Sequence, residues 1–199
     1  MKEVKFSLRE MAFAALFGAG TAAGAYVVIP VAPVPITLQT LFLYVAAGLL
    51  GGRVAALSQV VYVLLGVIGL PVFAGGKAGL GILFGPTGGY LLGFILGAYA
   101  AGKLMPSNGV PGAVRTVLAL AAGTVVIYVP GVRTVLALAA GTVVIYVPGV
   151  LQLCVVAELS LVKALTVGVL PFLLGDGIKI AAATLVTIKL KPRMEQRLS

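Results

Sequence analysis

The chain has 199 residues, of which 61% are hydrophobic and only 10% are charged. A soluble domain carries about 25% charged residues and could not bury this much apolar surface at this size, so the composition excludes a soluble globular fold and indicates an integral membrane protein. The net charge of +9 does not indicate nucleic-acid binding, because no basic stripe with interleaved aromatic residues occurs, and the absence of histidine beside a single cysteine argues against a transition-metal site.

The first apolar run follows a short basic start and predicts a transmembrane helix near residues 11–29. No small-residue cleavage site with a polar continuation follows, so we expect a retained helix and not a cleaved signal. Ala15, Ala19 and Ala23 recur four residues apart on this helix, a spacing that lets another helix pack closely. This stripe would serve either internal packing or a partner subunit.

Five more apolar runs predict transmembrane helices near residues 38–52, 54–70, 84–103, 133–157 and 168–190. The alternation of apolar and polar residues that barrel strands require is missing. The expected fold is therefore an all-α, polytopic membrane protein with a bundle of six helices, in a single membrane domain over residues 1–199.

Two segments between the predicted helices cannot continue a helix. Residues 30–35 contain three prolines, and residues 69–81 are rich in glycine and contain Pro71 and the lone charge Lys77. Irregular backbone near a membrane is tolerated where it is buried in protein or faces water, so both segments are candidates for a cap over a ligand, with ordinary turns as the alternative. Lysine and arginine cluster before the first helix, at Arg53, after the fourth helix and at the end of the chain, which predicts cytoplasmic termini and places both segments outside.

An 18-residue segment occurs twice in tandem without change, at residues 114–131 and 132–149. Eighteen residues make five helical turns, so an inserted copy preserves the facing of a helix while it adds about 27 Å of length. If both copies span the membrane, there are seven helices and the basic C-terminus lies outside. We favour six functional spans with one redundant copy that extends a helix or lies at the cytoplasmic surface.

The chain lacks the residue patterns of an enzyme. With no histidine, the commonest general base is missing. The stretch GGKAG resembles a phosphate-binding loop, but that motif fails at Pro71 and Ala78. We expect no catalytic activity and no ATP hydrolysis by this chain alone.

Charged side chains inside a predicted span are costly and suggest function. Asp176 and Lys179 lie three residues apart in the last predicted helix and share one face, where they offer an acceptor and a donor to a polar solute. The alternative is a structural ion pair that joins two helices. Lys77 would suit a carboxylate, or else it is a solvated loop lysine.

Neutral polar groups lie near the same regions. Tyr90 follows Gly88 and Gly89 at the start of the fourth predicted span, where a tyrosine is also ordinary for a membrane interface. Thr37 and Gln39, followed by Thr40, stand at the mouth of the second span. Such groups contact a ligand or join helices.

Four blocks of the sequence, PVPITLQTLF, GLPVFAGG, GPTGGYLLGF and LPFLLGDGIK, resemble in order and spacing the BioY family, the biotin-specific S components of energy-coupling factor (ECF) transporters. The resemblance implies a six-helix S component in the cell membrane, with both termini in the cytoplasm and biotin held in an outward-facing cavity capped by the first and third loops. It also implies partners, namely a transmembrane coupling subunit and two ABC-type ATPases, which dock on the small-residue face of the first helix. No cofactor is implied, since biotin is the transported substrate.

For individual residues, the resemblance implies that Asp176 accepts hydrogen bonds from the ureido N–H groups of biotin. It also implies that Lys179 contacts the polar end of the ligand or orients Asp176. Tyr90 and the segment around Gly79 match the binding region of the family. Lys77 departs from the family pattern, which leaves the partner of the biotin carboxylate open. Two alternatives stand beside this hypothesis: an S component for another vitamin, and a structural membrane protein without a ligand.

Overall fold

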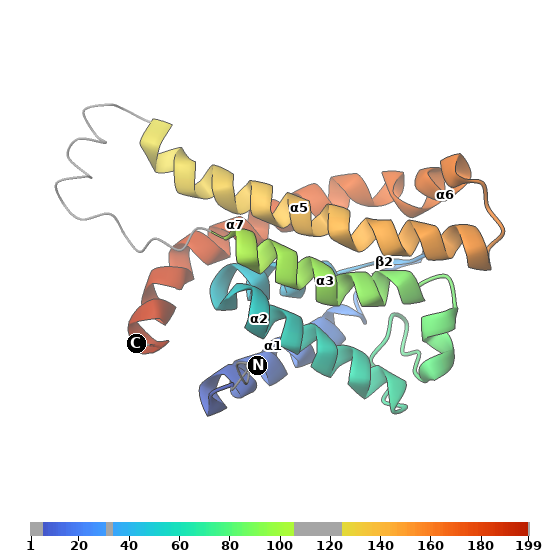
Figure 1. Ribbon diagram of the computed structural model, residues 1–199, viewed down its shortest axis with the longest axis horizontal. Coiled ribbons are helices and arrows are strands. Elements are labelled where there is room, and N and C mark those ends of the chain that lie inside the picture. The colour runs from blue at the N-terminus through green and yellow to red at the C-terminus, as the bar shows by residue number, and fades with distance from the viewer. Residues whose placement is uncertain (1–5, 31–33, 106–124, 199) are drawn as a thin grey trace, which may run out of the picture.

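The computed structural model describes residues 6–30, 34–105 and 125–198, and these ranges are mostly helical. The helices are α1 (Leu8–Gly24), α2 (Gln39–Val67), α3 (Gly88–Leu104), α5 (Val125–Val156), α6 (Leu161–Gly168) and α7 (Leu170–Leu198). A short 3₁₀ helix, η1 (Leu80–Phe84), precedes α3. The strands β1 (Val28–Ile29) and β2 (Ile36–Thr37) pair antiparallel, with Val28 opposite Thr37. The start of α1 and the end of α7 lie toward one end of the bundle, and the hairpin and α6 toward the other (Figure 1). The expected all-α bundle is confirmed.

Helix α1 begins at a capping box. The Ser7 hydroxyl accepts from the Glu10 N–H at 3.2 Å, and the Glu10 carboxylate accepts from the Ser7 N–H at 2.7 Å, which satisfies backbone donors that a helix start leaves free. Gly18 lies against α2, where an added Cβ would stand 2.9 Å from the carbonyl oxygen of Ser58. The sequence therefore determines both where α1 starts and how closely it approaches α2.

Helix α2 is folded back on itself at Gly51, whose φ of +75° lies outside the helical region. The side-chain amide of Gln39 at the start of α2 donates a hydrogen bond to the Tyr62 hydroxyl near its end. In a straight helix these residues would stand about 35 Å apart. Residues 39–50 and 52–67 are therefore two separate helical segments that lie side by side. They correspond to the two spans predicted near residues 38–52 and 54–70.

Helix α3 lies between α2 and α5 and packs on both through small residues (Figure 1). An added Cβ at Gly52 of α2 would meet the carbonyl oxygen of Tyr99 in α3, and one at Gly97 would stand 2.7 Å from the carbonyl oxygen of Gly141 in α5. Close backbone approach of this kind replaces the hydrophobic driving force that is missing between helices in lipid.

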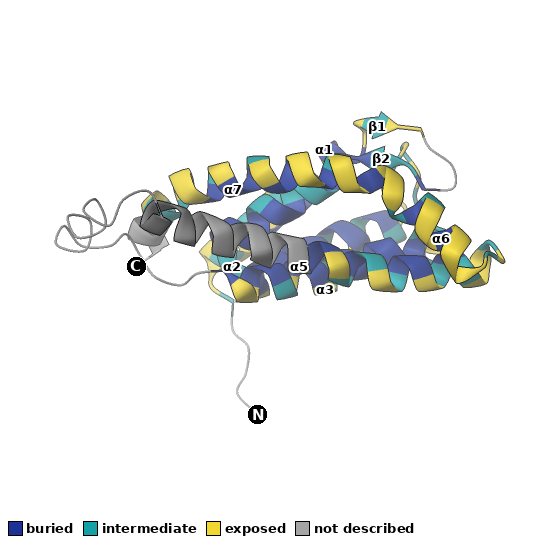
Figure 2. Cartoon of the chain, turned by 90° about the horizontal axis from the view of Figure 1, so that it is seen from above, coloured by how far each residue is buried: buried dark blue, intermediate teal, exposed yellow. Residues whose placement is uncertain are grey.

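The outer surface of the bundle is apolar. On α7, Leu174 is 79% exposed and Ile178 is 66% exposed, whereas Asp176 and Lys179 on the opposite face are buried. Figure 2 shows this division along α7. Two helices in the described ranges, Gln39–Val67 and Leu170–Met194, pass a test of length and hydropathy for a membrane span. An apolar exterior around buried charge is the arrangement that lipid favours.

Helix α5 contains the whole second copy of the repeat. Its 32 residues make one helix of about 48 Å, longer than the bilayer core of about 30 Å. The first copy contributes residues 125–131 to the start of α5, and residues 114–124 lie outside the described residues. Within the described part, the duplication therefore lengthens a helix.

Candidate functional site

A cavity of about 230 Å³ lies inside the bundle and extends to the irregular segments at one end. Its wall is formed by α2, α3, α5, α7 and the segments 34–37 and 73–87. One water needs only about 15 Å³ by this measure, so the space is large enough for an organic molecule. Most of the lining surface is apolar, and polar side chains reach it from α2, α3, α5 and α7 as well as from the irregular segments.

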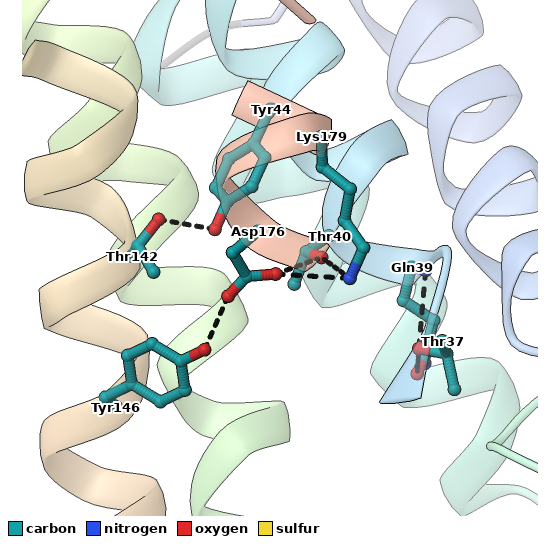
Figure 3. A network of polar contacts seen from close by, with 8 residues as sticks. All are labelled: Thr37, Gln39, Thr40, Tyr44, Thr142, Tyr146, Asp176 and Lys179. Carbon is teal, nitrogen blue, oxygen red and sulfur yellow. Dashed lines mark hydrogen bonds and ion pairs between the residues drawn. The ribbon is translucent and has the colours of Figure 1, made fainter. Parts of the chain in front are cut away.

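Asp176 and Lys179 line this cavity as a buried ion pair (Figure 3). The Lys179 ammonium lies 3.1 Å from one Asp176 carboxylate oxygen and donates a hydrogen bond to the Thr40 hydroxyl at 3.0 Å. The Tyr146 hydroxyl donates to the other carboxylate oxygen at 2.5 Å. The residues are 5% and 7% exposed, so each charge depends on the other for stabilisation. The network connects α7 to both α2 and α5.

The contacts within the described residues leave part of this pair available. Asp176 accepts from Lys179, from Tyr146 and, at 3.4 Å, from Thr40, whereas a carboxylate offers about four acceptor positions. Lys179 donates to Asp176 and Thr40, which leaves one of its three ammonium protons. The pair can therefore offer a ligand one acceptor and one donor without breaking the bonds that hold it.

Tyrosines form much of the remaining polar wall. The Tyr44 and Thr142 hydroxyls lie 2.5 Å apart and join α2 to α5. The Tyr90 hydroxyl donates to the Gly168 carbonyl oxygen at 3.0 Å, and its ring meets the Tyr146 ring edge to face with centroids 6.3 Å apart. Tyr90 thus faces the cavity with a hydroxyl that is already bonded to backbone, so its ring is the part suited to a ligand.

The irregular segments form the outer end of the cavity. The Thr37 hydroxyl donates to the Gln39 side-chain oxygen at 2.7 Å. Phe73 and Lys77 pair across a tight loop, in which Gly75 and Gly76 have positive φ. Lys77 lines the cavity from this loop and is otherwise exposed to solvent. A cation at the mouth is the geometry expected for contact with an anionic group.

The structure brings together most of the residues singled out from the sequence. Those that line this cavity are Thr37, Gln39, Lys77, Tyr90, Asp176 and Lys179. Gly79 is not part of the lining. Its φ is +94°, and its N–H donates to the Gly66 carbonyl oxygen at 2.7 Å, so it shapes the turn into η1, where a side chain would be strained.

Sequence reasoning missed Tyr44, Thr142 and Tyr146 as members of the network. A signal exists, because Thr40 and Tyr44 are four residues apart, as are Thr142 and Tyr146. This spacing places both hydroxyls of each pair on one helix face. The pattern identifies a polar face but does not say what that face contacts.

The alanine stripe of α1 faces away from the bundle. Ala15, Ala19 and Ala23 are exposed, whereas Ala14 and Ala22 are buried against the rest of the chain. The stripe therefore contributes little to packing against the residues that the structure describes.

The sequence and the fold of this chain are both similar to those of known biotin transport proteins. The BioY family model matches residues 1–136 and 133–196. The chain is 39% identical to the biotin transporter BioY of Thermotoga maritima, over 92% of this chain and 96% of that one, and 33% identical to the probable biotin transporter BioY of Pyrococcus horikoshii, with the same coverage. Its fold is similar to the crystal structure of the S-component for biotin from an ECF-type ABC transporter, with a TM-score of 0.75 and 23% identity over 92% of this chain and 91% of that chain. The chain belongs to the BioY family.

Proposed function

We propose that this chain is the membrane subunit that captures biotin from outside the cell for uptake. The observation that carries the proposal is the buried Asp176–Lys179 pair in the wall of an otherwise mostly apolar cavity. Relatives named biotin transporters over nearly the full length of the chain support the choice of ligand.

The chemistry of biotin suits this cavity. Biotin has a rigid ureido ring, an apolar thiophane ring and a carboxylate tail, and such a ligand needs an apolar pocket with a few directed polar groups. The free acceptor position of Asp176 would take a ureido N–H, and the remaining proton of Lys179 would contact the ureido oxygen. The aromatic rings of Phe73, Phe94 and Phe172 would pack on the thiophane.

The carboxylate tail would lie toward the irregular segments, where Lys77 lines the mouth of the cavity. This assignment uses the one cation at the outer end that lines the cavity among the described residues. Thr37 and Gln39 would support the same end of the ligand, although the Thr37 hydroxyl already donates to Gln39.

The partners in this proposal are a transmembrane coupling subunit and two ABC-type ATPases. The chain has no phosphate-binding motif of its own, so the energy for uptake comes from elsewhere. The exposed stripe Ala15, Ala19 and Ala23 on α1 is the proposed docking surface, because small residues let a partner helix approach closely.

In the membrane, the chain would cross the bilayer six times with both termini in the cytoplasm. The position of lysine and arginine along the sequence supports this orientation. The start of α1 and the end of α7 lie toward the same end of the bundle, opposite the irregular segments that border the cavity (Figure 1). The cavity would then open to the outside.

Equilibrium binding of labelled biotin to the purified protein tests the proposal. We expect saturable binding that unlabelled biotin competes away and that riboflavin and thiamine do not. Competition by another vitamin would reassign the ligand. No binding of any vitamin by correctly folded protein would favour a structural membrane protein and refute the proposal.

A further inference from the structure

Gln152 on α5 ties a cavity wall to the helical bundle. Its side-chain amide donates two hydrogen bonds, to the Leu83 carbonyl oxygen at 2.6 Å and to the Gly85 carbonyl oxygen at 2.7 Å. Leu83 lies in the last turn of η1, where a helix leaves its final carbonyls without partners of its own. Gly85 follows η1, and its carbonyl oxygen also accepts from the Gly88 N–H at 3.1 Å. One amide group therefore holds the end of η1 and the turn that follows it.

Two glycines make this contact possible. At Gly88, an added Cβ would stand 2.7 Å from the Gln152 amide nitrogen, and at Gly89 it would meet the carbonyl oxygen of Pro148. The start of α3 can thus lie directly against α5, and the Gln152 side chain can reach across to η1. The Gly-Gly pair before Tyr90 serves this close approach between helices.

The segment that Gln152 holds is part of the cavity wall. Gly81, Ile82, Gly85, Pro86 and Thr87 line the cavity. Gln152 itself does not line it. Gln152 therefore influences the ligand site indirectly, because it determines where this segment of the wall lies.

The irregular segments are also bonded to each other. The Tyr26 hydroxyl donates to the Pro71 carbonyl oxygen, and the Gly75 N–H donates to the Ala25 carbonyl oxygen at 3.4 Å. These bonds link the segment after α1 to the segment before η1 but do not attach either of them to α5. The two Gln152 bonds attach segment 80–87 to α5, so they oppose any displacement of this part of the cavity wall away from α5.

We propose that Gln152 is a positioning residue that keeps the segment 80–87 closed over the cavity and sets the rate at which ligand enters and leaves. The proposal rests on the proposed binding of biotin in this cavity. Because Gln152 does not touch the cavity, its bonds stabilise the closed segment with or without ligand. Their loss therefore raises the association and dissociation rates together and leaves the equilibrium constant nearly unchanged.

Gln152→Met tests this proposal, since methionine has a similar length and shape but no donor. Two ordinary hydrogen bonds are lost, so we expect both rate constants for labelled biotin to rise by about 5- to 150-fold, with little change in Kd. Gln152→Lys keeps a donor of sufficient reach and should restore rates close to those of the unaltered protein. Val155→Met places the same side chain at an exposed position of α5 and should leave the rates unchanged.

A second readout does not need biotin. A spin label at Leu80→Cys, an exposed position of η1, in a chain with Cys154→Ser, should become more mobile with Gln152→Met and not with Val155→Met. Unchanged label mobility refutes the role of Gln152 even if the protein binds no biotin. A weaker Kd with unchanged association would also overturn it, because that result indicates a general loss of structure at the site.

Discussion

Replacement of Asp176 by asparagine is the sharpest test of the ligand site. The carboxylate accepts hydrogen bonds from Lys179 and Thr40 on one oxygen and from Tyr146 on the other. An amide replaces one of these oxygens by an NH₂ group, which would face donors on that side and could accept from none of them. Loss of one partner of a buried ion pair costs about 3–5 kcal/mol of stability. A ligand hydrogen bond to a charged group contributes about 1.5–3 kcal/mol, and each 1.4 kcal/mol is about tenfold in affinity. We therefore expect biotin to bind more than tenfold more weakly, while the protein still folds.

A neutral double variant separates the loss of stability from the loss of binding. Asp176→Asn together with Lys179→Met removes both charges of the buried pair, so neither is left uncompensated, and thermal unfolding followed by circular dichroism should return toward that of the unaltered protein. Biotin affinity, measured with labelled biotin in detergent, should remain more than tenfold weaker. Glu158→Gln neutralises an exposed acid between α5 and α6 and should change neither property.

The result that refutes the reasoning is a double variant that folds and binds biotin as tightly as the unaltered protein. The pair would then serve only to hold α7 against α2 and α5. The structural alternative that the sequence left open would be correct, and the proposed ligand contacts would be wrong.

Three further predictions test other parts of the structure. Deletion of residues 132–149 gives the same chain as deletion of residues 114–131, because the copies are identical, and it keeps one Thr–Tyr pair for the cavity. The affinity for labelled biotin should be unchanged. Loss of binding in correctly inserted protein would show that the extra length is needed. Gly51→Ala places a side chain at φ +75°, ψ 172° and should cost about 1–3 kcal/mol, seen as a lower unfolding temperature by circular dichroism; an unchanged temperature contradicts the fold-back geometry. Ala19→Leu should leave biotin binding intact but reduce uptake by cells that express the complete transporter, whereas normal uptake would exclude docking through this stripe.

Several features of the site were predictable from the sequence because they depend on residue type alone. A carboxylate and an ammonium in an apolar segment are too costly to be incidental, which identified Asp176 and Lys179. Glycine and proline mark positions where a helix cannot continue, which identified the segments that border the cavity. The role of Gly79 could not be predicted from the sequence, since glycine serves both for close approach to a ligand and for a turn with positive φ.

The amino-acid sequence alone was enough to predict a helical membrane bundle, because hydropathy and the cost of buried charge are local properties of each segment. Only the tertiary structure decided which face of each helix meets the cavity, since that depends on contacts between residues far apart in the chain. The bond from Gln39 to Tyr62 shows that α2 folds back, and the bond from Tyr146 to Asp176 brings the second repeat copy to the ion pair. Rotation of a helix about its axis leaves its composition unchanged, so no count of residues could have revealed these partners.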